Sequence, residues 1–253
     1  MPFRKIRNGA FVRGDNRGTP KKHQEYCNCI DYLFHGNVYV KRSIKHCVWQ
    51  KKNRRWYFTF VEIDERIIIE VSEGVYPPSE DSYLLLGCIE VGKEKVLEVG
   101  TGTGIIALHA AKRGADVTAV DIKQEAVENA RKNAEMNGIK IHVEQSDLFS
   151  NVSGIFDVII FNPPYLPSDK MEEAWEGGEE GIEVAKRFLE KARFYLSHKG
   201  RIYIVLSTLG NIKKLIDDFE QFYDFEEIGR MNLFFEKLIV YKITCKDTET
   251  NFR

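Results

Sequence analysis

The stretch KVLEVGTGTGIIALHAAK, residues 95–112, decides the fold of this 253-residue chain. Lys95–Val99 is a short apolar run of strand type, and Ile105–Lys112 is an alanine-rich run of helical type. Glycines between a strand and a helix let the backbone turn sharply and come close to a ligand. The stretch therefore predicts a strand, a ligand-facing corner that includes Gly100 and Gly102, and a helix.

The alternation of strand and helix continues beyond this stretch. Further strands are expected at 116–120, 139–144, 156–161 and 201–206, and helices at 125–137, 185–196 and 212–219. Two strand-like runs, about 224–231 and 234–244, end the chain. Strands that alternate with helices of this length form parallel pairs. The pattern therefore predicts an α/β fold: a doubly wound, mostly parallel sheet with helices on both faces and an antiparallel edge.

Residues 1–60 are expected to form a basic, partly disordered extension in front of a catalytic domain at residues 61–253. The extension has 14 Lys and Arg against 3 Asp and Glu, whereas the remainder has 23 against 35. A surface that holds a polyanion is not usually acidic. The net charge of the domain therefore argues against nucleic acid as its substrate. Only the basic extension is expected to be able to contact nucleic acid. A hairpin of Trp56–Ile63 with Arg66–Val71 is expected at the junction.

The five cysteines do not form a regular disulfide framework. The sequence shows no secretory signal and no apolar run near the roughly 20 residues that a membrane span needs. We therefore expect a reduced, cytoplasmic location. The spacing of Cys27, Cys29, His46 and Cys47 is atypical of zinc sites, so ordinary thiols and no metal site are expected there.

Acidic residues stand at the ends of three successive predicted strands, namely Glu98, Asp121 and Asp147. In an open α/β sheet the ligand crevice lies beyond the C-terminal strand ends, and a carboxylate there accepts hydrogen bonds from ribose hydroxyls. We assign that role to Asp121 and contact with an adenine amino group to Asp147. The G-x-G-x-G spacing differs from that of dinucleotide sites, and Glu98 would repel a pyrophosphate but attract a cationic sulfonium. The corner is therefore expected to bind S-adenosylmethionine rather than a nicotinamide dinucleotide.

The sequence FNPPYLP, residues 161–167, ends one predicted strand and opens onto the same crevice. Asn162 offers an acceptor oxygen, and Pro163 has no N–H but keeps its carbonyl as a second acceptor. Together with the aromatic face of Tyr165, these acceptors suit an –NH₂ group on a planar system. Such a nitrogen is a poor nucleophile because its lone pair is delocalised, so orienting it toward an electrophilic methyl group supplies much of the rate. The corner therefore predicts methylation of an amide or exocyclic amino nitrogen.

These residues resemble a known family. The stretch 98–104, Asp121 and the sequence NPPY at 162–165 are similar to class I S-adenosylmethionine-dependent methyltransferases, where NPPY is shared among adenine-amino, guanine-amino and protein glutamine enzymes. Two further stretches, Val75–Leu86 and Ala174–Gly181, resemble HemK-like protein-(glutamine-N5) methyltransferases of the archaeal and eukaryotic branch. That family methylates the glutamine of the Gly-Gly-Gln loop in class I translation termination factors.

The resemblance covers about residues 70–243 and implies further expectations. It implies a seven-stranded Rossmann-like sheet, S-adenosylmethionine as cofactor, and a small zinc-binding activator subunit that covers an apolar edge of the catalytic domain. It also implies cofactor contacts, to which we add Gly102 and Asn162, so that the expected set is Ser82, Glu98, Gly100, Gly102, Asp121, Asp147, Leu148 and Asn162. The glutamine amide is expected to be held by Asn162, Pro163 and Tyr165.

Two alternative hypotheses remain. The first is a nucleic-acid amino methyltransferase that holds a flipped base in the same corner and uses the basic extension as a clamp. The second is a non-catalytic scaffold with a methyltransferase fold, against which the intact Gly100, Asp121 and Asn162 argue. The sequence leaves open which protein is methylated, whether lysine is also accepted, and what residues 1–60 do.

Overall fold

The computed structural model of the chain describes residues 32–35, 38–41, 46–52, 55–61, 64, 66–165 and 181–246, the first four strands by their backbone alone. The helices are α1 (Glu80–Cys88), α2 (Ile105–Lys112), α3 (Gln124–Met136), α4 (Glu183–Ala192) and α5 (Ile212–Phe219). The strands are β1 (Tyr32–His35), β2 (Val38–Lys41), β3 (His46–Lys52), β4 (Arg55–Val61), β5 (Lys95–Val99), β6 (Asp116–Asp121), β7 (His142–Gln145), β8 (Phe156–Phe161), β9 (Leu196–Ser207), β10 (Tyr223–Asn232) and β11 (Lys237–Cys245).

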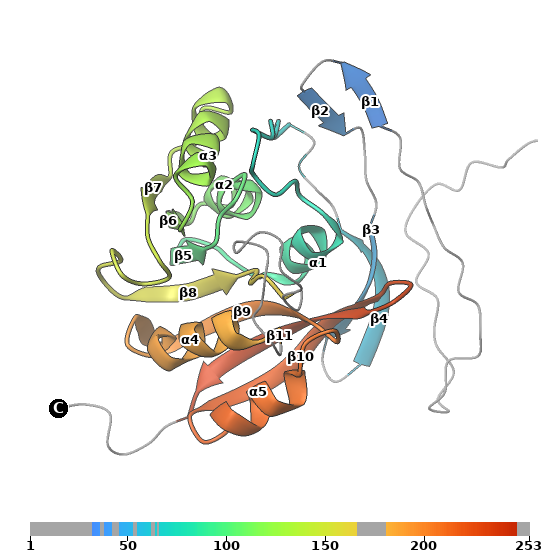
Figure 1. The fold of residues 1–253 in the computed structure, drawn as a ribbon, viewed down its shortest axis with the longest axis vertical. Coiled ribbons are helices and arrows are strands. Elements are labelled where there is room, and N and C mark those ends of the chain that lie inside the picture. Colours follow the sequence, from blue (N-terminus) through green and yellow to red (C-terminus); the bar gives the residue numbers. More distant parts are fainter. Residues whose placement is uncertain are drawn as a thin grey trace, which may run out of the picture.

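One large sheet, ordered β4-β3-β10-β11-β9-β8-β5-β6-β7, organises the molecule, and β1 and β2 form a separate two-stranded sheet (Figure 1). The five strands from β9 to β7 run parallel, and β11 and β10 continue the sheet in antiparallel fashion. These seven strands confirm the predicted mixed sheet. The expected boundary between extension and domain at residues 60–61 stays a prediction.

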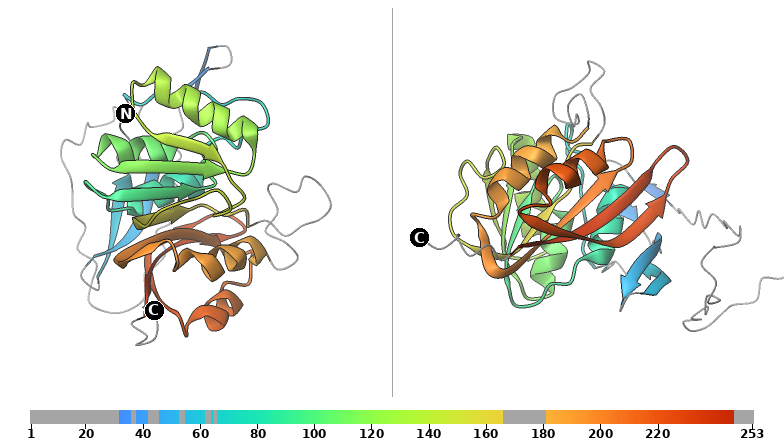
Figure 2. Two further views of the ribbon diagram at one scale, coloured as in Figure 1. Left: turned by 90° about the vertical axis from the view of Figure 1, so that its left-hand side faces the viewer. Right: turned by 90° about the horizontal axis from the view of Figure 1, so that it is seen from below.

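Helices bury both faces of the central strands, so the strand residues on each face are apolar. One core cluster joins α1, α2 and α3 to side chains such as Val96 and Val158, and the other joins α4 and α5 to neighbours such as Leu97 and Ile159. Successive strand residues point to opposite faces. The two groups of helices accordingly lie on opposite sides of the strands (Figures 1 and 2).

Three predicted boundaries are wrong for local reasons. The last strand was expected from about residue 234, but β11 begins at Lys237, because the Leu233 N–H closes a turn on the Glu236 carbonyl at 2.8 Å. Leu196 was expected to belong to the helix before it but is the first residue of β9, since α4 ends at Ala192 in a turn closed by hydrogen bonds from the backbone N–H groups of Phe194 and Tyr195. Ile139 was expected to begin a strand. Its N–H instead donates to the Ala134 carbonyl at 3.0 Å, which closes the end of α3, and β7 starts only at His142.

The predicted hairpin of Trp56–Ile63 with Arg66–Val71 is also wrong. The partner of β4 is β3, and this antiparallel hairpin joins the sheet through β3, which pairs with the outer edge of β10. The sheet therefore continues for two strands beyond the antiparallel pair β10–β11, and these strands come from the basic extension.

The segment at residues 68–72 is held by a ladder of three asparagines on α3 and its C-cap instead of by a strand. Asn137 pairs with both backbone groups of Ile68 (2.8 and 2.7 Å), and Asn133 with both of Glu70 (3.0 and 2.9 Å). Asn129 completes the ladder at Ser72 N and Glu70 O, at 2.9 Å each. Four helical residues rise about 6 Å, nearly the length of two extended residues, so the two repeats stay in step.

The described part of the chain has no helix long and apolar enough to cross a membrane. The expectations for the cysteines of the extension and for the stretch 174–181 are not tested. Cys27 and Cys29 lie outside the described residues, as do the side chains of His46 and Cys47 and most of the stretch 174–181.

We expect Asn133→Ala to destabilise the fold by about 1–3 kcal/mol, because it leaves the part-buried Glu70 N–H and the buried Thr103 carbonyl without this partner. Urea unfolding measures the change. Asn137→Ala is the matched control, since its bonds to Ile68 are exposed and its loss should be smaller. Equal losses in the two variants would contradict the role assigned to burial.

Candidate active site

Parallel register brings four strand ends to one edge of the sheet. Val99 of β5 lies between Val120 of β6 and Phe161 of β8, and Asp121 pairs with Gln145 of β7. The loops that follow these strands carry most of the predicted site residues. The sheet therefore gathers the glycine corner, the acidic strand ends and the NPPY corner into one region.

The glycine corner adopts a backbone that other residues rarely adopt. Gly100 and Gly104 have φ values of +68° and +80°. A Cβ at Gly104 would lie 3.1 Å from the Ala130 Cβ, so α3 packs directly on the corner. A Cβ at Gly100 would lie 3.5 Å from the Phe161 ring and 3.8 Å from the Asn162 carbonyl oxygen. The corner and the NPPY strand end are therefore in close contact.

Glu98 is buried beneath this corner. Its Oε2 accepts hydrogen bonds from the Thr101 hydroxyl at 2.7 Å and the Ala107 N–H at 3.0 Å. Burial raises the pKa of Glu98 to about 8; these two bonds oppose the rise, and the nearby charge of Asp121 adds to it. The carboxyl group thus ties the corner to α2, and its contact with a cofactor stays a prediction.

Asp121 ends β6 and links two loops. Its Oδ2 accepts from the Gly102 N–H at 2.9 Å and its Oδ1 from the Lys123 N–H at 3.0 Å. Burial raises the pKa of Asp121, although these hydrogen bonds act in the opposite direction. A carboxylate has about four lone-pair sites, so acceptor capacity remains for ligand hydroxyls.

Asp147 and Leu148 follow β7 at the next strand end. The Asp147 carboxylate is half-exposed and pairs with Arg187 of α4 at 2.7 Å. Leu148 has a φ of +51°, which no other non-glycine residue of the described ranges shares in the left-handed region. Its carbonyl accepts from the buried Ser146 hydroxyl at 2.9 Å. Strained residues of this kind cluster at ligand sites, which agrees with the predicted role.

Asn162 presents a buried acceptor without a partner. Its Oδ1 is inaccessible to solvent and has no hydrogen bond in the described structure. Buried polar atoms are almost always paired, so this oxygen is suited to accept a donor from a ligand. Tyr165, three residues on, packs against the core cluster of α1–α3.

Asp81 is a site residue that the sequence analysis missed. It is buried in the first turn of α1, and its Oδ2 accepts from the hydroxyls of Tyr165 (3.3 Å) and Tyr76 (3.4 Å). Its Oδ1 accepts from the backbone N–H and hydroxyl of Ser82, at 2.6 and 3.1 Å. An acid beside the wholly buried run at 84–86 was the available signal, since a buried acid needs polar partners.

The two tyrosine hydroxyls at Asp81 are proton donors. Burial is the main cause that raises the pKa of Tyr165, and the charge of Asp81 and the proximity of Tyr76 and Glu236 raise it further. Burial and Asp81 also raise the pKa of Tyr76. Both rings therefore stay protonated at neutral pH and are held by one carboxylate beside the NPPY corner.

Comparisons with known proteins find one family model and relatives that are methyltransferases. Residues 73–235 match the family model described as the methyltransferase small domain. A relative from Methanocaldococcus jannaschii, provisionally named a protein N5-glutamine methyltransferase, is 40% identical over 186 residues, 70% of this chain and 94% of the relative. A release factor glutamine methyltransferase from Streptococcus pneumoniae is 34% identical over 165 residues, 59% of this chain and 57% of the relative. A solved methyltransferase from Pyrococcus furiosus superposes with a TM-score of 0.54 at 26% identity, over 69% of this chain and 88% of that one.

We expect Glu98→Gln to change how stability depends on pH. The folded pKa of about 8 lies above the ordinary value of 4.5, so between these values the folded protein keeps a proton that the unfolded chain releases. The wild-type free energy of unfolding therefore falls as the pH rises through this window, by at most about 1.4 kcal/mol per pH unit. The amide side chain that Glu98→Gln introduces does not titrate, so the variant lacks this contribution.

Urea unfolding without cofactor, at about pH 5.5 and about pH 8.5, measures the two slopes. Glu125→Gln, at an exposed position of α3, is the control and should keep the wild-type slope. Identical slopes for the wild type and Glu98→Gln would show that the buried carboxyl group does not titrate in this window.

Proposed function

Because the chain belongs to the methyltransferase small domain family, we propose that it methylates the side-chain amide nitrogen of a glutamine in a protein. The proposed target is the glutamine of the Gly-Gly-Gln loop in a class I translation termination factor. The chain is an S-adenosylmethionine-dependent N-methyltransferase. The glutamine substrate is supported by the names of two relatives, one of which matches along nearly its whole length.

The unpaired Oδ1 of Asn162 is the observation that carries this proposal. A buried acceptor at the end of β8 calls for an N–H donor, which a glutamine amide supplies. Pro163 has no N–H to donate but keeps its carbonyl oxygen as an acceptor. This carbonyl is proposed to accept the second amide hydrogen. With both hydrogens held, the amide plane is fixed and the nitrogen lone pair is directed out of that plane.

Orientation and charge stabilisation are the catalytic contributions of this corner. A positioned nucleophile avoids the entropic cost of a bimolecular encounter, and the Asn162 oxygen stabilises positive charge that grows on the nitrogen. Tyr165 is proposed to pack its ring against the amide, held in place by Asp81. The nitrogen becomes acidic once its new bond to carbon has formed, so no base is needed before attack and the proton passes to water afterwards.

The cofactor residues fit S-adenosylmethionine by their chemistry, and the group supplies an electrophilic methyl on a cationic sulfonium when it is bound. The positive-φ glycines Gly100 and Gly102 are proposed to admit the ligand close to the backbone. Asp121 keeps acceptor capacity for ribose hydroxyls, and the exposed Asp147 together with the buried Leu148 is proposed to contact adenine. Ser82 and Glu98 complete the proposed cofactor set.

A protein substrate agrees better with the charge of the domain than a nucleic acid does. The chain beyond residue 60 carries 23 basic against 35 acidic residues, which disfavours a polyanion. We also propose a cytoplasmic location and, from the resemblance of Val75–Leu86 to the HemK-like branch, a small zinc-binding activator subunit as partner. Only the basic extension is proposed to contact nucleic acid.

The substrate is tested with labelled S-adenosylmethionine, the activator subunit, and a termination factor with its Gly-Gly-Gln glutamine intact or replaced by alanine. Label is expected in the intact factor only. RNA from the same cells is the parallel substrate. Label in that RNA, with none in the factor, would identify an amino methyltransferase of nucleic acid instead.

We expect Asn162→Ala to lower the turnover number by about 100–1,000-fold, the usual effect of losing one stabilising hydrogen bond in a transition state. Binding of S-adenosylmethionine, measured by calorimetry, should be retained, because the other seven residues of the expected cofactor set are unchanged. Asn211→Ala is the matched control, because Asn211 caps α5 by accepting from the Lys214 N–H at 3.1 Å. Normal turnover by Asn162→Ala would exclude the proposed mechanism.

A further inference from the structure

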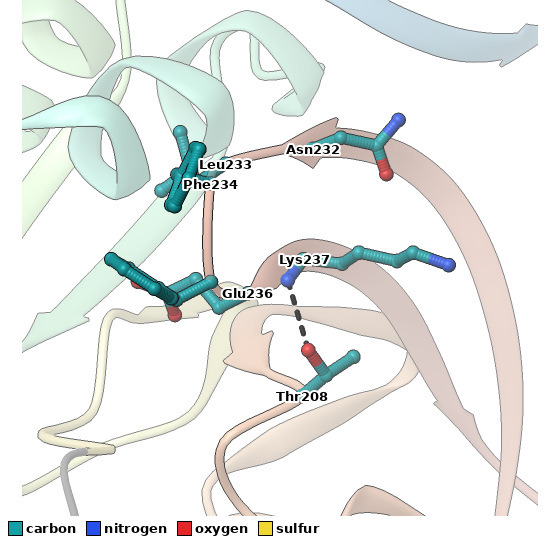
Figure 3. A pocket seen from close by; sticks show the side chains of 7 residues that line it. Thr208, Asn232, Leu233, Phe234, Glu236 and Lys237 are labelled. Carbon is teal, nitrogen blue, oxygen red and sulfur yellow. Dashed lines mark hydrogen bonds between the residues drawn. The ribbon is translucent and has the colours of Figure 1, made fainter.

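The turn between β10 and β11 lies at the same edge of the sheet as the catalytic corner. Because β11 is antiparallel to β9, it begins where β9 ends, and Leu238 pairs with Ser207. The residues before Leu238 therefore stand beyond the C-terminal end of β9, which is the next strand to β8 and its Asn162. Figure 3 shows this turn with the end of β9 beneath it.

Hydrogen bonds hold the turn firmly to β9. The Lys237 N–H donates to the Thr208 hydroxyl at 2.9 Å, and the Thr208 N–H donates back to the Lys237 carbonyl at 3.0 Å. The buried Ser207 hydroxyl donates to the Glu236 carboxylate. The Leu233 N–H closes the turn on the Glu236 carbonyl at 2.8 Å. The turn is therefore fixed relative to the catalytic edge.

The turn is also continuous with the substrate side of the corner. Leu233 and Tyr165 pack against the same core cluster. The carboxylate of Glu236 is close enough to Tyr165 to raise the pKa of its hydroxyl, after burial, Asp81 and Tyr76. The turn therefore lies beside Tyr165, where the glutamine amide is proposed to bind.

Two phenylalanines at the tip of the turn are exposed to solvent. Phe234 is 82% exposed and Phe235 is 86% exposed, and their rings meet edge to face with centroids 4.5 Å apart. They line a hollow of about 500 Å³ together with Thr208, Asn232, Leu233, Glu236 and Lys237. Contiguous exposed apolar side chains with a polar rim are typical of binding surfaces.

We propose that Phe234 and Phe235 form a docking surface for the protein substrate, where an apolar side chain next to the methylated glutamine packs against the two exposed rings. This inference rests on the proposed function and adds a specificity element outside the catalytic corner. Two rigid aromatic rings offer large contact area at low entropic cost, so they are suited to select a polypeptide by its apolar neighbour residue.

The negative charge beside the two rings favours a polypeptide over a nucleic acid as the partner that binds this surface. Figure 3 shows Phe234 and Glu236 on one side of the turn, with the side chain of Lys237 extending to the other. The carboxylate therefore shares the side of the exposed ring, and it would repel a phosphate backbone. An uncharged or basic peptide loop meets no such repulsion there.

The test uses the full chain with its activator and compares the wild type with the double variant Phe234→Ser/Phe235→Ser. Phe194→Ser is the matched control, because Phe194 is 63% exposed but precedes β9, at the opposite edge of the sheet. Calorimetry gives the dissociation constant of the termination factor, and initial rates give its KM and kcat. Thermal unfolding confirms that each variant folds, which the exposure of all three rings favours.

We expect the double variant to raise the dissociation constant and KM for the factor at least about ten-fold, as truncation of a hot spot does. Its effect on kcat should be smaller, and Phe194→Ser should match the wild type. Equal constants for wild type and double variant, or an equal loss in Phe194→Ser, would overturn this inference while the proposed function stands. A wild type that neither binds nor methylates the factor, whether or not it labels RNA, would overturn both.

Discussion

The parallel register of β5, β6 and β8 is the constraint on which the rest of the site depends. It sets Val99, Val120 and Phe161 side by side, so whatever follows these strands must share one space. The glycine corner after β5 therefore lies against the Asn162 carbonyl after β8. The chemistry of the protein thus begins with backbone pairing, and side-chain identity decides only how the shared space is used.

Glu98, Asp121 and Asp81 have different tasks because the surroundings of their carboxylates differ. Glu98 is enclosed and ties the corner to α2, whereas Asp121 joins two loops by accepting one N–H on each oxygen. Asp81 stands apart as the anchor of two tyrosine hydroxyls. Hydrogen bonds to a buried acid reduce the cost of burial, so each acid also stabilises the loop that supplies its donors.

Patterns in the sequence correctly predicted those strands and helices whose bounds depend on neighbouring residues. The strands β5 and β8 and the helix α2 appear within the expected bounds, because apolar runs and glycines report on their own neighbourhood. The bond from Tyr165 to Asp81 joins residues 84 positions apart, and no periodicity records such a pairing. Leu196 was misplaced for the opposite reason, since its spacing from Ala192 continues the helical pattern across a turn.

The asparagine ladder has a consequence for the order in which the chain takes shape during synthesis. The backbone at 68–72 is paired with side chains 57 to 69 positions later in the sequence. Strand β3 pairs with β10, which lies more than a hundred residues further along the chain. Contacts of such long range form late, after the loops between them have closed. Both segments are therefore synthesised before their partners, and the emerging chain carries each of them unpaired until α3 or β10 has been made.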